Sequence, residues 1–371
     1  MLVFHRKFHY FIVVFLCFLF WAKSNGDIPL DAEGEWNLFG RFRLRVEQDS
    51  DNVPLISDRT RIRLGNFAGI RFTPDDHWEL VVRGRAGDKR NSRTIDSTIY
   101  VDNGFSYGQR GFILDQYFAN YTIDDYARIT IGRAAMPFWS NTEKLWDQDL
   151  TPIGGALVAK LNSSSNPLEL AIGSFHMPDG LNHFHAWMHA VQLHWAQEGR
   201  TWNWQWALSL FSRPGETGGR YLLLGEDERD YLIGQFSLRV SGQLWGRPAY
   251  VGLDWLENLE GYSSSDSDLI SLTFRDETTG AAIAFNFGQN QKRGDWRFRY
   301  VYAHVEWLSA FSSYATTSFG WLQKSNVRVH DIRMDYSISD KWKLTGRVSP
   351  AKKIIGTRES TRYRIDMSRP F

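Results

Sequence analysis

Hydrophobic and polar residues alternate along most of the chain, and the alternation returns about every 20 residues, with turn residues between. No segment of this alternating region shows the 3.6-residue periodicity of an amphipathic helix, so the pattern predicts β-strands throughout. Residues 201–211 are typical, because Trp202, Trp204 and Trp206 share one face and Asn203 lies on the other. We expect sixteen strands, at residues 36–47, 59–72, 77–87, 111–122, 126–134, 154–162, 167–175, 186–196, 201–211, 230–241, 247–256, 280–288, 294–305, 326–338, 341–350 and 361–371.

The connections between these strands alternate in length. Short turns are expected at 73–76, 163–167, 198–200 and 339–340, and long connections at 88–110, 136–153, 212–229, 257–279 and 306–325. The segment 268–274 also alternates, but a seventeenth strand would break the order, so we assign it to a long loop. An even number of strands, with short turns at one rim and long loops at the other, is typical of outer-membrane β-barrels.

Composition agrees with a membrane barrel. Aromatic residues make up 15% of the chain, yet mean hydropathy is −0.39, because lipid-facing and lumen-facing residues cancel in any window. Closure of the sheet is required, since an open edge in hydrocarbon leaves backbone groups unpaired. We therefore predict an all-β fold, a transmembrane antiparallel β-barrel of about 16 strands around an aqueous channel rather than a packed interior. The alternative, a soluble β-sandwich or propeller pair, would carry Thr, Ser and Lys on its outer face.

The first residues differ from the rest of the chain. Arg6 and Lys7 precede an apolar run from Tyr10 to Ala22. This is the layout of a secretory signal peptide, and a run of about 13 residues is too short to span a bilayer. We predict a cleaved signal peptide at residues 1–24, with an N-terminal membrane anchor as the alternative.

The predicted mature chain, residues 25–371, lacks Cys17, the only cysteine, so disulfides and a thiol nucleophile are not expected. Removing Arg6, Lys7 and Lys23 from 43 basic residues leaves 40 against 42 acidic residues. Because the predicted mature chain has no excess of basic residues, nucleic acid is not an expected partner.

Arginines form rows on one face of the first three predicted strands, in stretches such as "RFRLRV" and "RTRIRL". Large apolar side chains occupy the other face. An arginine that faces lipid at the bilayer midplane costs roughly 2 to 4 kcal/mol, so a whole row turned outward would cost more than most folds are stable by. We therefore expect these arginines to line the pore: Arg41, Arg43, Arg45, Arg59, Arg61, Arg63, Arg83 and Arg85.

The stretches "FGRFRLRVEQ", "RTRIRL", "PFWSNTEKLWDQDLTPIGGAL" and "KRGDWRFRYVYAHVE" resemble, in this order, a family of bacterial outer-membrane porins, single-chain sixteen-stranded barrels. The resemblance implies the outer membrane of a Gram-negative bacterium and passive diffusion of small hydrophilic solutes and ions. Expected partners are outer-membrane lipid and the solutes, and no cofactor is expected. The sequence leaves open which solute passes, the pore radius, and whether barrels associate as a homotrimer.

The last predicted strand places Tyr363, Ile365, Met367 and Phe371 on one parity and ends the chain on Phe371. This resembles the closing strand by which the barrel assembly machinery recognises outer-membrane proteins. We expect these four residues to form the assembly signal.

The connection at 136–153 is the third on the long side, and in porins this loop folds into the barrel and narrows it. It carries Glu143, Asp147 and Asp149. Placed across the lumen from the arginine rows, these acids would form a constriction with a transverse field, which filters ions by size and sign. The alternative is that the acids are simply solvated outside. The arginine rows suggest mild anion preference, unless acids on later strands offset them.

Other functions find less support. His176, His183, His185 and His189 could ligate zinc or copper, but half of the group is in a loop and no enzyme spacing fits, so no metal is expected. No motif supports an enzyme. An exporter of an anionic polysaccharide is the alternative function, because an arginine-lined barrel would suit that cargo.

Overall fold

The structure is a computed structural model, which describes residues 27–52, 58–88, 96–102, 110–143, 146–147, 149–162, 166–180, 182–220, 222, 226–263, 269–316, 322 and 325–371. The predicted signal peptide lies outside the described residues. No helix in the described part of the chain is long and apolar enough to cross a membrane.

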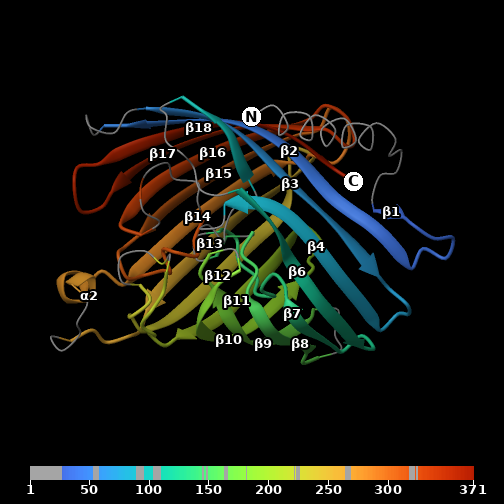
Figure 1. The fold of residues 1–371 in the computed structure, drawn as a ribbon, viewed down its shortest axis with the longest axis horizontal. Coiled ribbons are helices and arrows are strands. Elements are labelled where there is room, and N and C mark those ends of the chain that lie inside the picture. The colour runs from blue at the N-terminus through green and yellow to red at the C-terminus, as the bar shows by residue number, and fades with distance from the viewer. Residues whose placement is uncertain are drawn as a thin grey trace, which may run out of the picture.

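Sixteen antiparallel strands close into one barrel (Figure 1). Closure is made by β18 and β2, where Ile365 lies opposite Val46 and Met367 opposite Leu44. Every predicted strand coincides with one of these, so the fold prediction is confirmed. The strands are β2 (Trp36–Asp51), β3 (Arg59–Phe72), β4 (Trp78–Asp88), β6 (Arg110–Ile123), β7 (Ala127–Arg133), β8 (Ile153–Lys160), β9 (Leu168–Pro178), β10 (Phe184–Gln197), β11 (Trp202–Arg213), β12 (Tyr231–Leu244), β13 (Arg247–Asn258), β14 (Thr279–Gly288), β15 (Trp296–Val305), β16 (Val327–Ser337), β17 (Lys343–Lys353) and β18 (Glu359–Pro370).

Two further strands and one helix were not predicted. Strand β1 (Ile28–Pro29) pairs with β2 at one rim. Strand β5 (Asp96–Val101) lies within the predicted long loop and pairs with the part of β3 that β4 does not reach. The helix α2 (Leu269–Phe274) belongs to the connection between β13 and β14, so the assignment of this segment to a loop rather than a strand is confirmed.

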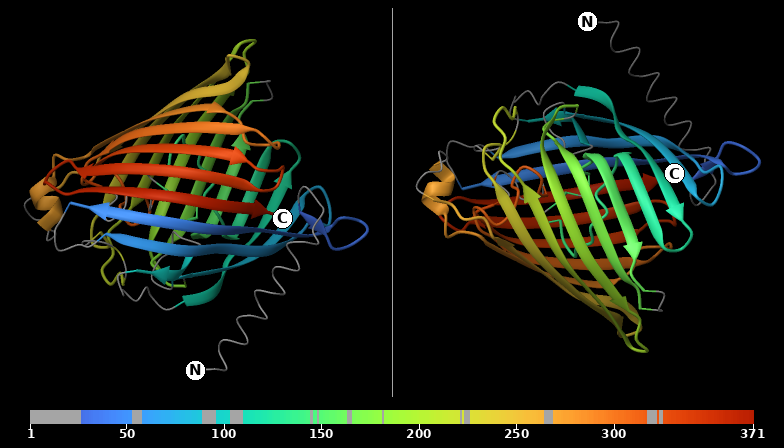
Figure 2. Two further views of the ribbon diagram at one scale, coloured as in Figure 1. Left: turned by 90° about the horizontal axis from the view of Figure 1, so that it is seen from above. Right: turned by 90° about the horizontal axis from the view of Figure 1, so that it is seen from below.

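The two rims of the barrel differ as predicted. The helix α2 and the long connections lie at one end, and the short turns and the C-terminus lie at the other (Figure 2). Trp36, Trp78 and Trp296 each begin a strand at the short-turn rim, and Trp36 stacks on Phe72 with ring centroids 4.2 Å apart. Aromatic residues at this level form the girdle that a barrel needs at the membrane interface.

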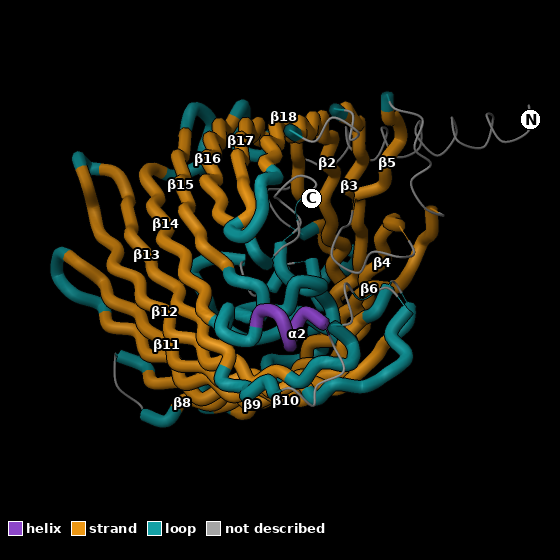
Figure 3. The backbone as a smooth tube through the Cα atoms, turned by 90° about the vertical axis from the view of Figure 1, so that its left-hand side faces the viewer, coloured by secondary structure: helices purple, strands orange, loops and turns teal. Residues whose placement is uncertain are grey.

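The interior is partly packed, so the expectation of an aqueous channel without a packed interior holds for only one side of the lumen. Figure 3 shows connecting segments inside the ring of strands. Phe311 and Tyr314, from the connection between β15 and β16, are buried in an apolar cluster with Trp146 and with Phe211 and Tyr231 of the barrel wall.

The inner wall explains this packing. Inward positions on β14 and β15 carry small side chains, among them Ala282, Ala284 and Ala303, which are almost fully buried. Small residues leave room beside the wall, and apolar loop side chains that fill it are removed from water. One side of the lumen is therefore packed, and the opposite side, along β2 to β4 and β16 to β18, remains polar.

Candidate functional site

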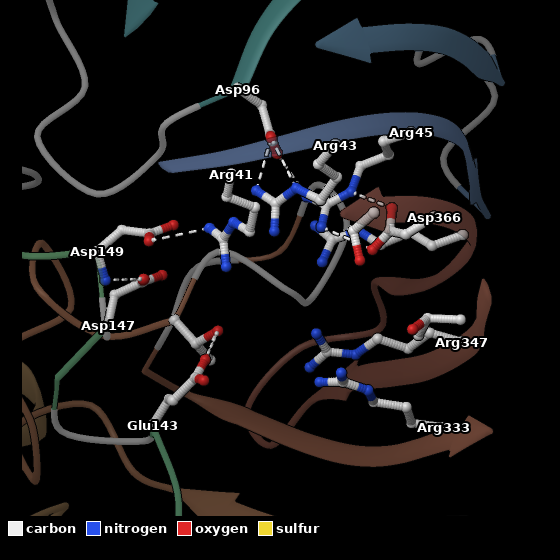
Figure 4. A pocket seen from close by; sticks show the side chains of 14 residues that line it. Arg41, Arg43, Arg45, Asp96, Glu143, Asp147, Asp149, Arg333, Arg347 and Asp366 are labelled. Atoms are coloured by element: carbon white, nitrogen blue, oxygen red, sulfur yellow. Dashed lines mark hydrogen bonds and ion pairs between the residues drawn. The ribbon is translucent and has the colours of Figure 1, made fainter. Parts of the chain in front are cut away.

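A cavity of about 210 Å³ lies between the polar wall and the connection at residues 134–152, which we call the inner loop (Figure 4). The cavity is lined by Arg41, Arg43, Arg45, Asp96, Glu143, Asp147, Asp149, Thr316, Arg333, Thr345, Arg347, Arg364, Asp366 and Ser368. Six arginines face five carboxylates, so the formal net charge of the lining is +1 when all are ionised. Both signs of charge are therefore concentrated at one level of the lumen.

The inner loop supplies the acids of one side. Glu143, Asp147 and Asp149 line the cavity rather than lying outside the barrel. Asp149 Oδ1 is 3.9 Å from Arg41 Nη2. Burial raises the pKa of the Asp149 carboxyl, because the charged form loses water. The lining therefore becomes more positive as pH falls, and Asp149 contributes to this at a higher pH than an ordinary aspartate.

Three of the predicted pore-lining arginines belong to the cavity. Arg41, Arg43 and Arg45 project from β2 into it. Arg43 Nη2 and Arg45 Nη1 each lie 2.6 Å from a carboxylate oxygen of Asp96, and Arg45 Nε donates to Asp366 Oδ1 at 2.6 Å. Strand β5 thus contributes an acid that fixes two arginines of the neighbouring wall.

The other five predicted arginines do not line the cavity: Arg59, Arg61, Arg63, Arg83 and Arg85. Their side chains form ion pairs with acidic side chains on the inner face of the barrel wall. Glu47 pairs with Arg61, and Asp49 pairs with Arg59. Asp115 accepts from Arg83 at 2.6 Å and lies 3.0 Å from Arg85 Nε. Glu47, Asp49 and Asp115 are almost fully buried, so the rows carry much less net charge than their arginine count suggests.

Three arginines of the cavity were not among the predicted pore-lining residues: Arg333, Arg347 and Arg364. Arg347 of β17 donates to both carboxylate oxygens of Asp331, each at 2.6 Å. Arg333 of β16 donates to Asp335 Oδ1 at 2.9 Å. Side-chain parity indicates inward positions on these later strands as well, since Arg333 shares its face with these two aspartates, but only the arginines of the first three strands were predicted to line the pore.

Asp254 of β13 holds the inner loop across the lumen. Its Oδ1 accepts from the Asn141 backbone N–H at 3.1 Å, and its Oδ2 accepts from Thr142 Oγ1 at 2.6 Å. The Asn141 side chain also donates to the backbone carbonyls of Leu238 and Leu253, each at 3.0 Å. The inner loop is thus anchored to the wall opposite the arginine strands.

We expect Asp254→Ala to release this anchor. The three charge-assisted hydrogen bonds from Asn141 and Thr142 to this carboxylate are lost, each contributing on the order of 1.5 to 3 kcal/mol. Single-channel recordings should show a larger and noisier conductance than the wild type. The control is Asp230→Ala, which removes an aspartate bonded to Gly215 N–H outside the inner loop. An unchanged, quiet conductance in Asp254→Ala would contradict the anchor.

The four histidines considered as metal ligands have separate partners: His176, His183, His185 and His189. His176 stacks on Trp187, His189 Nδ1 is 3.0 Å from Ser174 Oγ, and His185 Nε2 contacts a backbone carbonyl. Within the described ranges, no group of three or more such side chains could hold a metal ion.

The residues of the expected assembly signal lie on the outer face of the closing strand. Tyr363, Ile365 and Met367 are exposed at 48%, 60% and 36%. Phe371 follows β18, and its backbone exchanges two hydrogen bonds with Gly40 of β2, at 2.7 and 3.0 Å. The last residue therefore completes the seam of the barrel, and recognition by the assembly machinery stays a prediction.

Comparison with known proteins agrees with this architecture. Residues 34–203 match the sequence model of a family described as "Putative porin". A search among curated proteins found no match. The structure is similar to OprB of Pseudomonas putida, with a TM-score of 0.58, 9% identity and coverage of 91% of this chain and 94% of that one. It is also similar to a BenF-like porin of Pseudomonas fluorescens Pf-5, with a TM-score of 0.51, 11% identity and coverage of 91% and 98%.

The closed barrel, its two unlike rims and its charged inner cavity define a β-barrel channel protein of the outer membrane of a Gram-negative bacterium. The match over residues 34–203 confirms the resemblance to porins found in the sequence. The structural similarities, at about a tenth identity, show the fold alone.

Proposed function

We propose that the protein is a passive diffusion channel for small hydrophilic solutes and ions, with mild anion preference. The observation that carries the proposal is the cavity in which six arginines face five carboxylates, three of them on the inner loop. Such opposed charges orient polar solutes and select ions by sign. The excess of one positive charge favours anions only weakly, because lumen water screens it. The protein acts without catalysis.

Swelling of proteoliposomes in neutral sugars of graded size tests the diffusion function. We expect swelling with monosaccharides and a steep decline for larger oligosaccharides, because the inner loop narrows the lumen. The Asp254→Ala variant should shift the decline to larger sugars. Proteoliposomes that do not swell in any sugar, although the folded protein is inserted, would contradict a general diffusion channel.

We also propose that the barrels associate as a homotrimer through the face of β7 to β11. Strands β7 and β8 have 7 and 8 residues, fewer than the roughly 9 to 11 needed to cross the hydrocarbon. An outer hollow of about 730 Å³ lies over Gly155, Leu157 and Ile172. In a head-to-tail contact that repeats around a three-fold axis, a projecting part of one barrel can enter the hollow of the next.

A bulky side chain in this hollow should prevent association. We expect Gly155→Trp to shift the species seen by native mass spectrometry from trimer to monomer. Gly346→Trp is the matched control, because Gly346 lies on another part of the outer face with open space around it. A wild type that is monomeric in mild detergent and in lipid nanodiscs would refute the proposal.

A further inference from the structure

The outer surface of the barrel carries a basic cluster near the long-loop rim. Arg328 of β16 lies opposite Lys352 of β17 in the strand register. Both are exposed, whereas Val327 and Val329, on the other parity of β16, are buried inside the barrel. His304 of β15 lies opposite Arg328 on the other side. Two cations and a histidine therefore face outward at the level where the outer leaflet begins.

Hydrogen bonds hold part of this cluster in place. Arg328 Nε donates to His304 Nδ1 at 3.1 Å, and His304 Nε2 is 3.5 Å from Glu306. In the part of the chain that the structure describes, neither Arg328 nor Lys352 forms an ion pair with a carboxylate. Glu359 lies opposite Lys352 in the register of β17 and β18. The two cations are thus directed outward with most of their hydrogen-bonding capacity unused.

An apolar groove runs along the same strands toward the middle of the membrane. It has a volume of about 460 Å³ and is centred on Gly346, with Ile332, Met334, Val348 and Ile365 among its lining residues. A Cβ added at Gly346 would meet no atom within 4 Å, so the absent side chain creates the groove.

The distance between the basic cluster and the groove matches the distance between the headgroup and an acyl chain of one lipid. Gly346 is six residues from Lys352 on β17, which is roughly 20 Å along the strand and, at a tilt of about 45°, roughly 14 Å in depth. A headgroup beside Lys352 would therefore place an acyl chain in the groove below it. Near the interface an exposed arginine or lysine costs only about 0 to 1 kcal/mol.

We propose that this surface binds lipid A, the phosphorylated, multiply acylated glycolipid of the outer leaflet. Arg328 and Lys352 bind a phosphate of the headgroup, because charge-assisted hydrogen bonds favour an anionic acceptor. The groove over Gly346 receives an acyl chain. This chain fills the space that is open because Gly346 has no side chain. The site is on the outside of the barrel and is independent of the proposed diffusion function.

Native mass spectrometry of the full-length mature barrel in detergent, titrated with purified lipid A bearing two phosphates, tests the site. We expect Arg328→Gln/Lys352→Gln to bind lipid A roughly tenfold more weakly than the wild type. Gly346→Leu should weaken binding roughly fivefold by filling the groove. Arg200→Gln is the control, because it removes an exposed cation in a short turn at the opposite rim.

Two comparisons separate the sources of binding energy. Lipid A without phosphates should bind the wild type as weakly as two-phosphate lipid A binds the double variant. Phosphatidylglycerol, which shares a phosphate but has only two chains, should bind less well than lipid A. Equal lipid A binding by the wild type and both site variants would overturn the proposal. Phosphatidylglycerol binding as tight as lipid A binding would also overturn it. An SDS gel of unheated samples verifies that each variant is folded.

Discussion

Replacing Arg333 and Arg347 by glutamine is expected to change the channel from mild anion preference to cation preference. The lining then holds four arginines against five carboxylates. Asp331 also loses its ion pair with Arg347, and Asp335 loses Arg333 but keeps Arg297. One unit charge acting on an ion about 8 Å away in water contributes about 0.5 kcal/mol, a factor of two to three. Two charges should therefore lower chloride permeability and raise potassium permeability by about five- to sixfold each, so their ratio should change by roughly thirtyfold before salt screening. Reversal potentials in a KCl gradient measure this ratio.

The same change of charge on the outer wall is the control. Arg328→Gln/Lys352→Gln removes two cations that face away from the lumen, and it should leave the reversal potential as in the wild type. The effect of the lumen variant should decrease as salt rises, because the screening length falls from about 10 Å at 0.1 M to about 3 Å at 1 M. If the Arg333→Gln/Arg347→Gln channel kept the wild-type reversal potential at low salt, the cavity would not lie on the ion path.

Glu47→Gln is expected to destabilise the barrel strongly. Glu47 is 1% exposed. It pairs with Arg61, accepts from Arg364 at 2.8 Å and lies 3.7 Å from Arg63. Neutralising it leaves these buried guanidinium groups without their shared counter-charge, which typically costs about 3 to 5 kcal/mol. Urea unfolding in lipid vesicles measures the free energy of unfolding.

Two further variants locate the cause of this loss. Glu33→Gln changes an exposed carboxylate in the segment between β1 and β2 and should be neutral. In Glu47→Gln/Arg61→Gln one of the uncompensated arginines is also removed, so part of the stability should return, as in a double-mutant cycle. A loss below about 1 kcal/mol for Glu47→Gln would mean that lumen water screens the pair as it does at a surface.

The strands were predictable because period-2 alternation and turn residues are local signals. The alternation of short and long connections then fixed the strand number, since a barrel needs an even count. The packed half of the lumen was not predictable in this way. Ala282 and Ala303 point inward and are small, whereas Ile283 points outward and is large. The same alternation is expected whether water or a folded loop fills the space beside the inner face.

The candidate site was predictable in part for the same reason. Parity placed Arg41 on an inner face, and loop order placed Asp149 inside the barrel. Asp96 was missed because it lies in a segment read entirely as a loop. The anchor between Asp254 and Asn141 joins residues 113 positions apart, and no local pattern reports such a contact. The buried pairing of most arginines depends likewise on neighbours that only the sheet register brings together.

Anion preference of the lumen is tested by the reversal potential of the wild-type channel in a planar bilayer, under a low-salt KCl gradient. We expect a single conducting species whose zero-current potential has the sign of weak chloride preference. The preference for chloride should grow when pH is lowered, because the raised pKa of Asp149 causes that carboxylate to lose its charge. A firm preference for potassium at neutral pH, or a barrel that inserts without conducting, would contradict this expectation.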